Sequence, residues 1–351
     1  MQRVKKLQKL LASKKISAFL ITNRTNLKYL CNFRGTRGIC FITPKTAFFS
    51  TDARYFEEAK KLMPAGVRIV SLEKLPKLIK AKEIYFEEQY LTIAQLKYFK
   101  KTFCDAKWRG IQNLVENLRA IKEENEIKYI IKAQRIAEKV LHKIVSGLRD
   151  GITEKEVMIS IKRLGYEFGA DDTSFRPIVA FGANSSVPHH EPENRKLRKG
   201  DIILIDMGMK YKGYCSDMTR VFFFKKSPDL TQEKIYNLVL EAQNKAIKIL
   251  RAGISGKRAD LLTRKFFEKE NLAENFLHNL GHGVGLEIHE IPTLGQTYKE
   301  KLPAGAVVTV EPGIYLKKSF GVRIEDMVIL DGYKARNLTH FPKNLSSAII
   351  K

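Results

Sequence analysis

Cysteine is scarce in this sequence, and long hydrophobic runs are absent. The 351 residues include only four cysteines, which are scattered and form no Cys-x-x-Cys pair, so neither a disulfide framework nor a thiolate zinc site is indicated. No apolar run approaches the roughly 20 residues that a membrane-spanning helix needs. The N-terminal segment has an amphipathic helical pattern without the continuous apolar centre of a secretory signal. We therefore expect a cytoplasmic enzyme or binding protein with no membrane span.

Acidic residues are also in short supply. The chain has 38 Asp and Glu against 63 Lys and Arg, which gives a net charge of +25 and raises the question of nucleic acid. The lysines are nevertheless spread along the whole chain, often within helical patterns such as EEAKKL, and there is no zinc-finger, RNP or KH signature. We interpret the charge as a solvated, lysine-rich surface rather than as a nucleic-acid interface.

The remaining composition predicts two folded domains. Hydrophobic residues make up 44% of the chain. Residues 1–115 alternate short strand-like and helical stretches, which predicts a small α/β domain. A long amphipathic helix from about 122 to 149 opens a larger domain, residues 116–351, in which strand-rich segments follow helices. In the first domain we expect strands at 18–22, 38–43, 47–51, 67–70 and 83–88, and helices at 55–62 and 91–103.

The second domain carries a helix-start signal and a short repeat. Thr153 and Glu156 form a capping box that begins a helix reaching about residue 168. LRDGIT at 148–153 returns as LRAGIS at 250–255, which indicates either a duplicated α/β unit or a chance match. Further strands are expected at 177–181, 201–208, 214–224, 306–310 and 323–330, and further helices at 231–251 and 257–270.

Two aspartates stand in adjoining apolar strands in IDMGMKYKGYCSDMTR, residues 205–220. If a tight hairpin is centred between Tyr211 and Lys212, Asp206 and Asp217 lie directly opposite each other, with Cβ atoms about 4.5–5.5 Å apart. Two like charges this close in an apolar sheet are destabilising, unless one is protonated or a cation lies between them.

A second acidic pair follows the same pattern. Glu311 in AVVTVEPGIYL and Glu325 in GVRIEDMVIL flank a turn centred on Lys318, so they also come close to opposition. The Pro312-Gly313 step could shift this register. Four carboxylates in two strand pairs need more than one positive ion to neutralise them.

One histidine completes the candidate metal site. His282, in GHGVGLEIHE, stands between glycines that let the backbone approach its surroundings closely. Four carboxylates and one imidazole, without thiolates, suit Mn²⁺ or Co²⁺, with Zn²⁺ as a further candidate. The residues therefore predict two divalent ions, roughly 3.5–4 Å apart, that activate a shared water.

These segments resemble the pita-bread metallopeptidases. The resemblance is carried by DMGMKYKGYCSDMTR, GHGVGLEIHE, TVEPGIY and GVRIED. SVPHHEPENRKLRKGD and the N-terminal domain resemble the proline-specific branch, Xaa-Pro dipeptidase and Xaa-Pro aminopeptidase. The resemblance covers nearly the full chain. It implies an α+β fold, with a pita-bread catalytic domain preceded by a smaller creatinase-like α/β domain. It also implies a homodimer or higher homo-oligomer, with short proline-containing peptides as substrates.

The resemblance also implies roles for individual residues. His189 would bind substrate and stabilise the tetrahedral intermediate, and His289 would lie at the substrate beside the metals. Arg323 shares a strand face with Glu325, so it would orient a ligating carboxylate and help to bind substrate. Tyr315 either joins that network or simply packs in the core. Glu311 would carry a proton from the attacking water to the departing proline nitrogen. The metal ligands would be Asp206, Asp217, His282, Glu311 and Glu325.

Three alternatives remain open at this point. Methionine aminopeptidase shares the catalytic scaffold, but the N-terminal domain and Arg323 fit the proline branch better. Creatinase shares both domains but lacks the metal ligands, all of which are present here. Non-catalytic pita-bread proteins that bind nucleic acid or protein have usually lost ligands. The intact set therefore favours a dinuclear-metal-dependent peptidase.

Overall fold

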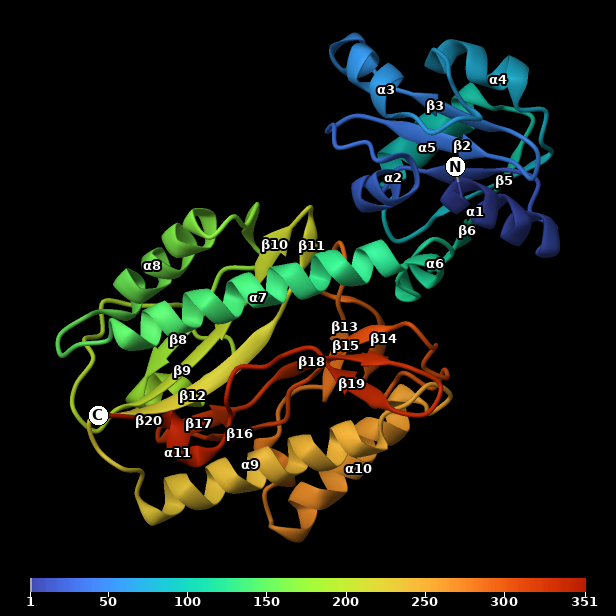
Figure 1. Ribbon diagram of the computed structural model, residues 1–351. Helices are drawn as coiled ribbons and strands as arrows, with labels where there is room; N and C mark the ends of the chain where they lie inside the picture. Colours follow the sequence, from blue (N-terminus) through green and yellow to red (C-terminus); the bar gives the residue numbers. More distant parts are fainter. Residues whose placement is uncertain (1) are drawn as a thin grey trace. The chain divides into compact units, whose positions relative to one another are not determined.

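The computed structural model describes residues 2–351, and the chain divides into two compact units, the first ending at Arg119 and the second beginning at Ala120. The sequence-based boundary at residue 115 lies a few residues earlier. Within the part of the chain described, no helix is both long and apolar enough to cross a membrane. Each unit has its own sheets and helices (Figure 1).

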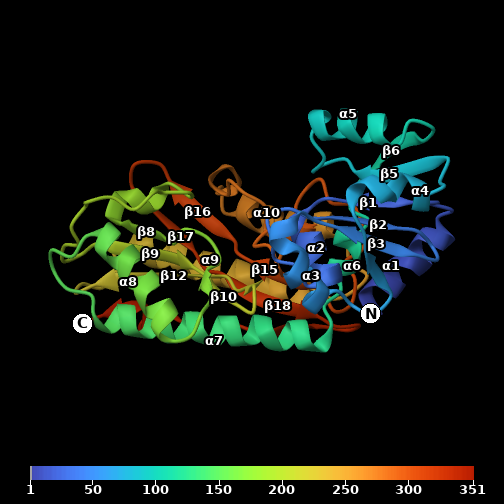
Figure 2. The ribbon, with the colours of Figure 1, turned by 90° about the horizontal axis from the view of Figure 1, so that it is seen from above.

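The first unit is built on one mixed sheet of six strands in the order β4-β3-β2-β1-β5-β6. Phe99 of α5 and Phe103, which directly follows the helix, pack against Phe41 and other apolar residues of the sheet, so α5 covers one of its faces (Figure 2). The elements are α1 (Gln2–Ser13), β1 (Phe19–Ile21), α2 (Arg24–Cys31), β2 (Ile39–Ile42), β3 (Ala47–Ser50), α3 (Phe56–Leu62), β4 (Val67–Ile69), α4 (Leu75–Leu78), β5 (Glu83–Glu87), α5 (Ile93–Thr102), β6 (Lys107–Ile111) and α6 (Glu116–Ala120).

The five strands expected in this unit are confirmed as β1 to β5, and the two expected helices are α3 and α5. The sequence did not predict α2, α4, α6 or the edge strand β6. No residue of β6 is fully buried, so its sequence KWRGI lacks the apolar alternation that identifies a half-buried strand.

The second unit places strands between two pairs of helices. Its main sheets have the orders β20-β12-β9-β8 and β14-β13-β15-β18-β19. The helices are α7 (Glu124–Ser146), α8 (Glu154–Glu167), α9 (Leu230–Ile249), α10 (Gly256–Lys269) and α11 (Leu345–Ala348). The strands are β7 (Asp172–Thr173), β8 (Ile178–Phe181), β9 (Ile202–Met207), β10 (Met209–Tyr211), β11 (Tyr214–Cys215), β12 (Met218–Phe224), β13 (Gly281–Gly283), β14 (Glu290–Leu294), β15 (Val307–Val310), β16 (Gly313–Leu316), β17 (Phe320–Arg323), β18 (Asp326–Leu330), β19 (Ala335–Asn337) and β20 (Ile349–Ile350).

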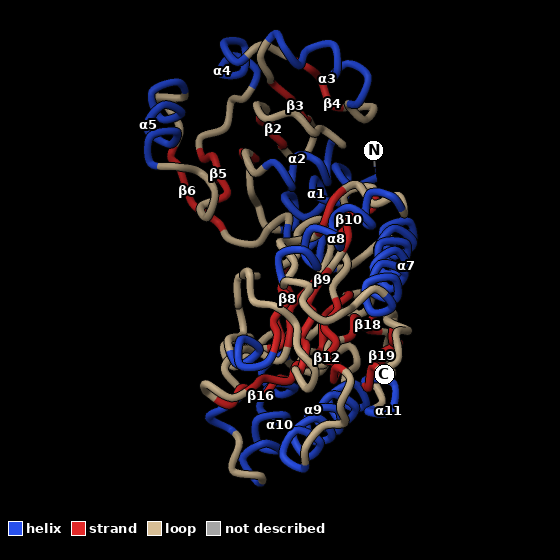
Figure 3. The backbone as a smooth tube through the Cα atoms, turned by 90° about the vertical axis from the view of Figure 1, so that its left-hand side faces the viewer, coloured by secondary structure: helices blue, strands red, loops and turns tan. Residues whose placement is uncertain are grey.

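Strand β9 is buried on both faces, and its alternation decides which way Asp206 faces. Ile203 and Ile205 pack in the core formed with α7 and α8. Ile202 and Leu204 pack in the core formed with α9 and α10, which lie side by side (Figures 1 and 3). Since side chains alternate along a strand, Asp206 faces away from α7 and α8.

The predicted capping box begins α8 as expected. Thr153 N donates to Glu156 Oε2 at 2.8 Å, and Glu156 N donates to Thr153 Oγ1 at 3.2 Å. The helix runs from Glu154 to Glu167, close to the predicted end.

The LRDGIT and LRAGIS segments occupy equivalent places in two halves of the second compact unit, and these halves repeat the same arrangement. Each contains a glycine with positive φ, followed by the N-cap residue of a helix, Thr153 or Ser255. The two halves share the same backbone hydrogen bonds, which run from Gly151 to Leu197 and from Gly253 to Leu302 at 2.9 Å, and from Gly200 to Phe224 at 2.8 Å and from Gly305 to Leu330 at 2.7 Å. Strands β9 and β12 therefore correspond to β15 and β18, and Asp206 corresponds to Glu311.

The predicted pairing of Asp206 with Asp217 is wrong by two residues. Asp206 lies across from Thr219. The turn is formed by Lys212 and Gly213, both with positive φ, 51° and 79°. A two-residue hairpin of this type needs positive φ at both central positions, so the turn includes the glycine and lies one residue later than predicted. A shift of two residues keeps every side chain on its face.

The predicted register of Glu311 and Glu325 is confirmed. Val310 pairs with Asp326 on one side of the acids, and Gly313 pairs with Arg323 on the other. Both ladders share one register centred on Lys318, so the Pro312-Gly313 step does not shift it. The ladder is interrupted at the two glutamates themselves, between β15 and β16 on one strand and between β17 and β18 on the other.

Candidate active site

The four predicted acids stand at strand ends within the second unit. Asp206 is the penultimate residue of β9, and Asp217 directly precedes β12. Glu311 directly follows β15, and Glu325 directly precedes β18. Asp206, Asp217 and Glu325 are only 8%, 4% and 1% exposed. The repeated strand pairs thus bring four carboxyl groups into one largely dry region.

His282 joins this group because β13 approaches its neighbours unusually closely. A Cβ atom on Gly281 would lie 2.1 Å from Thr309 O, and one on Gly283 would lie 2.6 Å from Ile291 O. Only glycine therefore fits on either side of the histidine. His282 Nε2 lies 3.4 Å from Glu311 Oε1 and 3.6 Å from Asp217 Oδ2.

The imidazole of His282 has the protonation state of a metal ligand. Its Nδ1 donates to Gly283 O at 3.1 Å, which assigns the proton to Nδ1 and leaves the Nε2 lone pair on the side of the carboxylates. Burial, with the nearby His289, lowers the pKa of His282 to about 4, so the ring is neutral at pH 7. One ligand atom each from Asp217, His282 and Glu325 lie within 4.8 Å of one another.

The electrostatics of the cluster fit bound cations. Burial raises the pKa values of Asp217 and Glu325 well above the usual range of a carboxyl group, and repulsion from the other carboxylates raises them further. Burial raises the pKa of Glu311 to about 8. Within residues 2–351, Asp206 Oδ1 and Asp217 Oδ1 are buried without any hydrogen-bond partner. Orphaned, mutually repelling carboxylate oxygens beside a neutral imidazole are a donor set for divalent metal ions.

Arg323 is the one buried cation paired with a carboxylate of this cluster in the part of the chain described. Its Nη2 donates to Asp206 Oδ2 at 2.5 Å, and its Nε donates to Thr219 Oγ1 at 3.1 Å. Its Nη1 donates to the Tyr315 hydroxyl at 2.5 Å and contacts Pro188 O at 3.4 Å. Arg323 therefore contacts the carboxylate of Asp206 rather than that of Glu325, and Tyr315 belongs to the same hydrogen-bond network. That Arg323 orients a ligating carboxylate stays a prediction.

The two predicted substrate histidines border the acids. The ring of His289 packs edge-on against that of His282, with centroids 4.3 Å apart. His189 directly follows Pro188, whose carbonyl Arg323 contacts. Burial, with the nearby His189, lowers the pKa of His289. All nine residues singled out in the sequence thus lie around one centre, although their individual roles remain predictions.

Three further residues of the centre were not identified from the sequence. Thr219 Oγ1 donates to Glu325 Oε2 at 2.7 Å, and Thr309 Oγ1 donates to Glu311 Oε1 at 3.1 Å. His278 Nε2 lies 2.9 Å from the Tyr315 hydroxyl. Each threonine stands two residues from an acid, so strand alternation could have placed both on the same face. His278 stands four residues before His282, but no regular periodicity links them.

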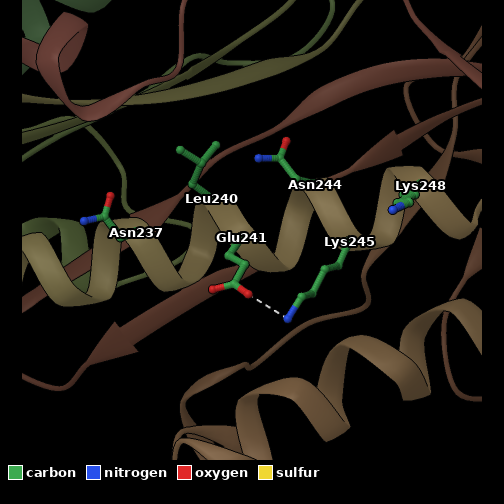
Figure 4. Close-up of a pocket in the computed structure, with 6 residues that line it drawn as sticks. All are labelled: Asn237, Leu240, Glu241, Asn244, Lys245 and Lys248. Carbon is green, nitrogen blue, oxygen red and sulfur yellow. Dashed lines mark ion pairs between the residues drawn. The ribbon is translucent and has the colours of Figure 1, made fainter.

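A surface groove on α9 has none of these features. It is lined by Asn237, Leu240, Glu241, Asn244, Lys245 and Lys248, all from this one helix (Figure 4). Its single carboxylate, Glu241, is paired with Lys245 at 2.6 Å. The groove therefore offers no donor set for a metal, and the acid cluster remains the candidate site.

Known proteins match both units. Residues 3–121 match the creatinase/prolidase N-terminal domain, and residues 128–331 match metallopeptidase family M24. An Xaa-Pro dipeptidase of Pyrococcus horikoshii is 32% identical over 348 residues, covering 98% of each chain.

Solved structures agree over the whole length. An Xaa-Pro dipeptidase from Bacillus anthracis has 37% identity and a TM-score of 0.94, covering 99% of both chains. An X-Pro aminopeptidase from Thermotoga maritima has 35% identity and a TM-score of 0.88, covering 98% of this chain and 99% of the other. The α+β pita-bread architecture with its creatinase-like N-terminal domain is thereby confirmed, and the chain belongs to metallopeptidase family M24 as a metal-dependent peptidase.

Proposed function

We propose that this metallopeptidase is an exopeptidase that hydrolyses the Xaa-Pro bond of dipeptides or short peptides. The observation that carries the proposal is the dry cluster of four carboxyls and a neutral imidazole, with two carboxylate oxygens left unpartnered. Relatives that share nearly the whole chain are named Xaa-Pro dipeptidase or X-Pro aminopeptidase.

Five residues would hold the metal ions. Carboxylate and imidazole donors without thiolates favour Mn²⁺, with Co²⁺ and Zn²⁺ as the next candidates. Two ions would balance the charge of the four acids better than one. Such ions supply Lewis acidity, which lowers the pKa of water and polarises a peptide carbonyl. The proposed ligands are Asp206, Asp217, His282, Glu311 and Glu325.

The remaining steps fall to side chains of this chain. Glu311 is the proposed proton carrier, since it would accept a proton from the attacking water while remaining a metal ligand and pass that proton to the departing proline nitrogen. The imidazoles of His189 and His289 would donate hydrogen bonds to the oxygen that gains charge during attack. Arg323 keeps Asp206 in one orientation and would help to bind the peptide. The network of Arg323, Tyr315 and His278 would keep these groups rigid.

The test compares substrates with and without metal. Protein stripped with a chelator and reloaded with Mn²⁺ should release glycine from Gly-Pro or from Gly-Pro-Pro-Leu, and the stripped protein should not. Gly-Leu serves as the control for proline specificity, and Met-Gly-Leu tests the methionine aminopeptidase alternative. Equal hydrolysis of Gly-Leu, or cleavage of Met-Gly-Leu alone, would refute the proposal. The ratio of the two proline substrates separates dipeptidase from aminopeptidase preference.

We also propose a cytoplasmic homodimer or higher homo-oligomer. The four cysteines are all free thiols, and three of them are buried, as expected of a protein kept in a reducing compartment. Light scattering of the purified protein would test the oligomeric state, and a monomeric mass with full activity would contradict it.

A further inference from the structure

The break in the strand pair at Glu311 and Glu325 leaves backbone groups without ladder partners. Glu311 N donates to Leu280 O at 2.9 Å, and Glu325 N donates to Thr219 O at 3.2 Å. The carbonyl of Ile324 also lacks a ladder partner, because Pro312 opposite it has no N–H to donate. The carbonyl of Val310, immediately before Glu311, lies across from Asp326 in the ladder and has room for a second partner.

A single side chain supplies both partners. Gln243, on α9, is fully buried, and its Nε2 donates to Val310 O and to Ile324 O, each at 3.0 Å. One amide nitrogen thus ties together the two peptide units that carry Glu311 and Glu325. Since each bond fixes a carbonyl next to an acid, the amide sets how far apart the strands lie at this point.

The amide is itself held in one orientation. Its Oε1 accepts from Lys343 Nζ at 2.7 Å, and Lys343 Nζ also contacts Asp326 Oδ2 at 2.7 Å. Lysine can only donate hydrogen bonds, so the oxygen of Gln243 must face Lys343 and the nitrogen must face the two carbonyls. Asp326 is paired in turn with Arg220, which donates to Glu325 O at 2.7 Å.

We propose that Gln243 is a positioning residue that fixes the separation of Glu311 and Glu325 and thereby strengthens metal binding. The inference rests on the proposed ligand set and adds a residue that touches neither metal nor substrate. A buried amide costs free energy unless it is hydrogen-bonded, and an apolar side chain would fill the same space in the α9 core. The amide of Gln243 therefore acts by fixing the positions of the two carbonyls rather than by filling space in the core.

The experiment measures metal binding rather than turnover. Gln243→Met keeps the length of the side chain and removes both donations. Calorimetric titration of the metal-stripped variant with Mn²⁺ should give a dissociation constant about 10- to 100-fold weaker than wild type. Tyr236→Phe is the matched control, because it removes a buried bond from α9 to Lys343 O, 3.0 Å in length, away from the acids. Its dissociation constant should stay at the wild-type value.

The outcomes separate this inference from the function it rests on. A folded Gln243→Met protein that binds Mn²⁺ as tightly as wild type would overturn the positioning role while leaving the peptidase proposal intact. Equal weakening in Tyr236→Phe would also overturn it, since the effect would then follow from general destabilisation. If Gln243→Met does not fold, Gln243→Glu retains the shape and the contact with Lys343 but loses both donations, and the same weakening is expected. Wild-type protein that binds no Mn²⁺ would overturn the ligand set and this inference together.

Discussion

Each acid of the cluster is unfavourable alone and becomes useful only with its neighbours. Burial raises the pKa of Asp217 and Glu325, and every further carboxylate raises it more. A core position would normally hold an apolar residue here, because two like charges in a dry region repel strongly. These acids therefore make the metal-free fold less stable and at the same time create a site that binds cations.

Asp217→Ala tests directly whether this acid strengthens metal binding and weakens the metal-free fold. The substitution should abolish metal binding and reduce Xaa-Pro hydrolysis to background, because a proposed ligand is lost. It should leave the metal-free protein at least as stable as wild type, because one buried carboxyl that repels its neighbours is removed. Mass spectrometry of bound metal and thermal melting of the stripped proteins measure the two effects. Wild-type metal content in the variant would contradict the ligand assignment.

His289→Ala is expected to behave differently at the same site. His289 borders the cluster through its ring contact with His282, and we assign it to substrate rather than to metal. Turnover should fall by about 10²- to 10³-fold, as when one oxyanion donor is removed, while the metal content stays unchanged. Loss of metal in this variant would make His289 a ligand and refute its assignment.

At the level of elements, β13 is defined by how closely it must approach its neighbours. Gly281→Ala would place a Cβ 2.1 Å from Thr309 O, which is backbone and cannot move aside. The substitution should lower stability by about 1–3 kcal/mol and weaken metal binding by displacing His282. Gly332→Ala is the control, because nothing lies within 4 Å of its Cβ position. Chemical denaturation measures the stability of both variants, and a Mn²⁺ titration measures their metal binding. A Gly281→Ala protein with wild-type stability and metal affinity would show that β13 does not need glycine at this position.

The elements also show what a sequence can predict. The Glu311 and Glu325 register was predictable because the short turn KKSFG, centred on Lys318, fixes which residues of its two strands lie opposite each other. The Asp206 hairpin was misplaced because the pattern does not say where within GMKYKGY the chain turns. Lys212 adopts the positive φ that its glycine neighbour adopts easily. The contacts of Gln243 could not be predicted from the sequence, because a hydrogen bond to a backbone carbonyl does not depend on the residue type that carries the carbonyl.

At the scale of the whole molecule, the repeat explains why acids gather at one place. Equivalent strand pairs from the two halves end at Asp206 and at Glu311, so duplication of one strand-end position supplies ligands from both sides. Asp217, Glu325 and His282 fall outside this one pair of equivalent positions, and the sequence motifs around them were needed to find them. The two domains were predictable because the pattern of short strands and helices gives way near residue 115 to one long amphipathic helix, whereas the short repeat alone could not be distinguished from a chance match.

The buried acids should make the free energy of unfolding of the metal-free protein fall as the pH rises. The pKa values of Asp217, Glu311 and Glu325 are all raised in the fold, that of Glu311 to about 8. The folded chain therefore holds protons that the unfolded chain releases near pH 4. Their contribution to the free energy of unfolding is fully present below that pH and is lost as the pH rises toward 8 and beyond. His278 and His282, with pKa values lowered to about 3 and about 4, act in the opposite sense, but only up to the unfolded histidine pKa of about 6.5.

A comparison between pH 7 and pH 9 avoids the titration of the histidines, and the Asp217→Ala variant distinguishes the acids from Cys40, whose raised pKa acts in the same direction. The stripped wild-type protein should melt at a lower temperature at pH 9 than at pH 7, and Asp217→Ala should show a smaller difference, because fewer raised carboxyls remain. Bound Mn²⁺ replaces the protons as the neutralising charge, so the metal-loaded wild-type protein should lose most of this dependence. A stripped protein whose melting temperature rises between pH 7 and pH 9 would show that the carboxyls are not held protonated by their mutual repulsion. The electrostatic case for a metal centre would then fail.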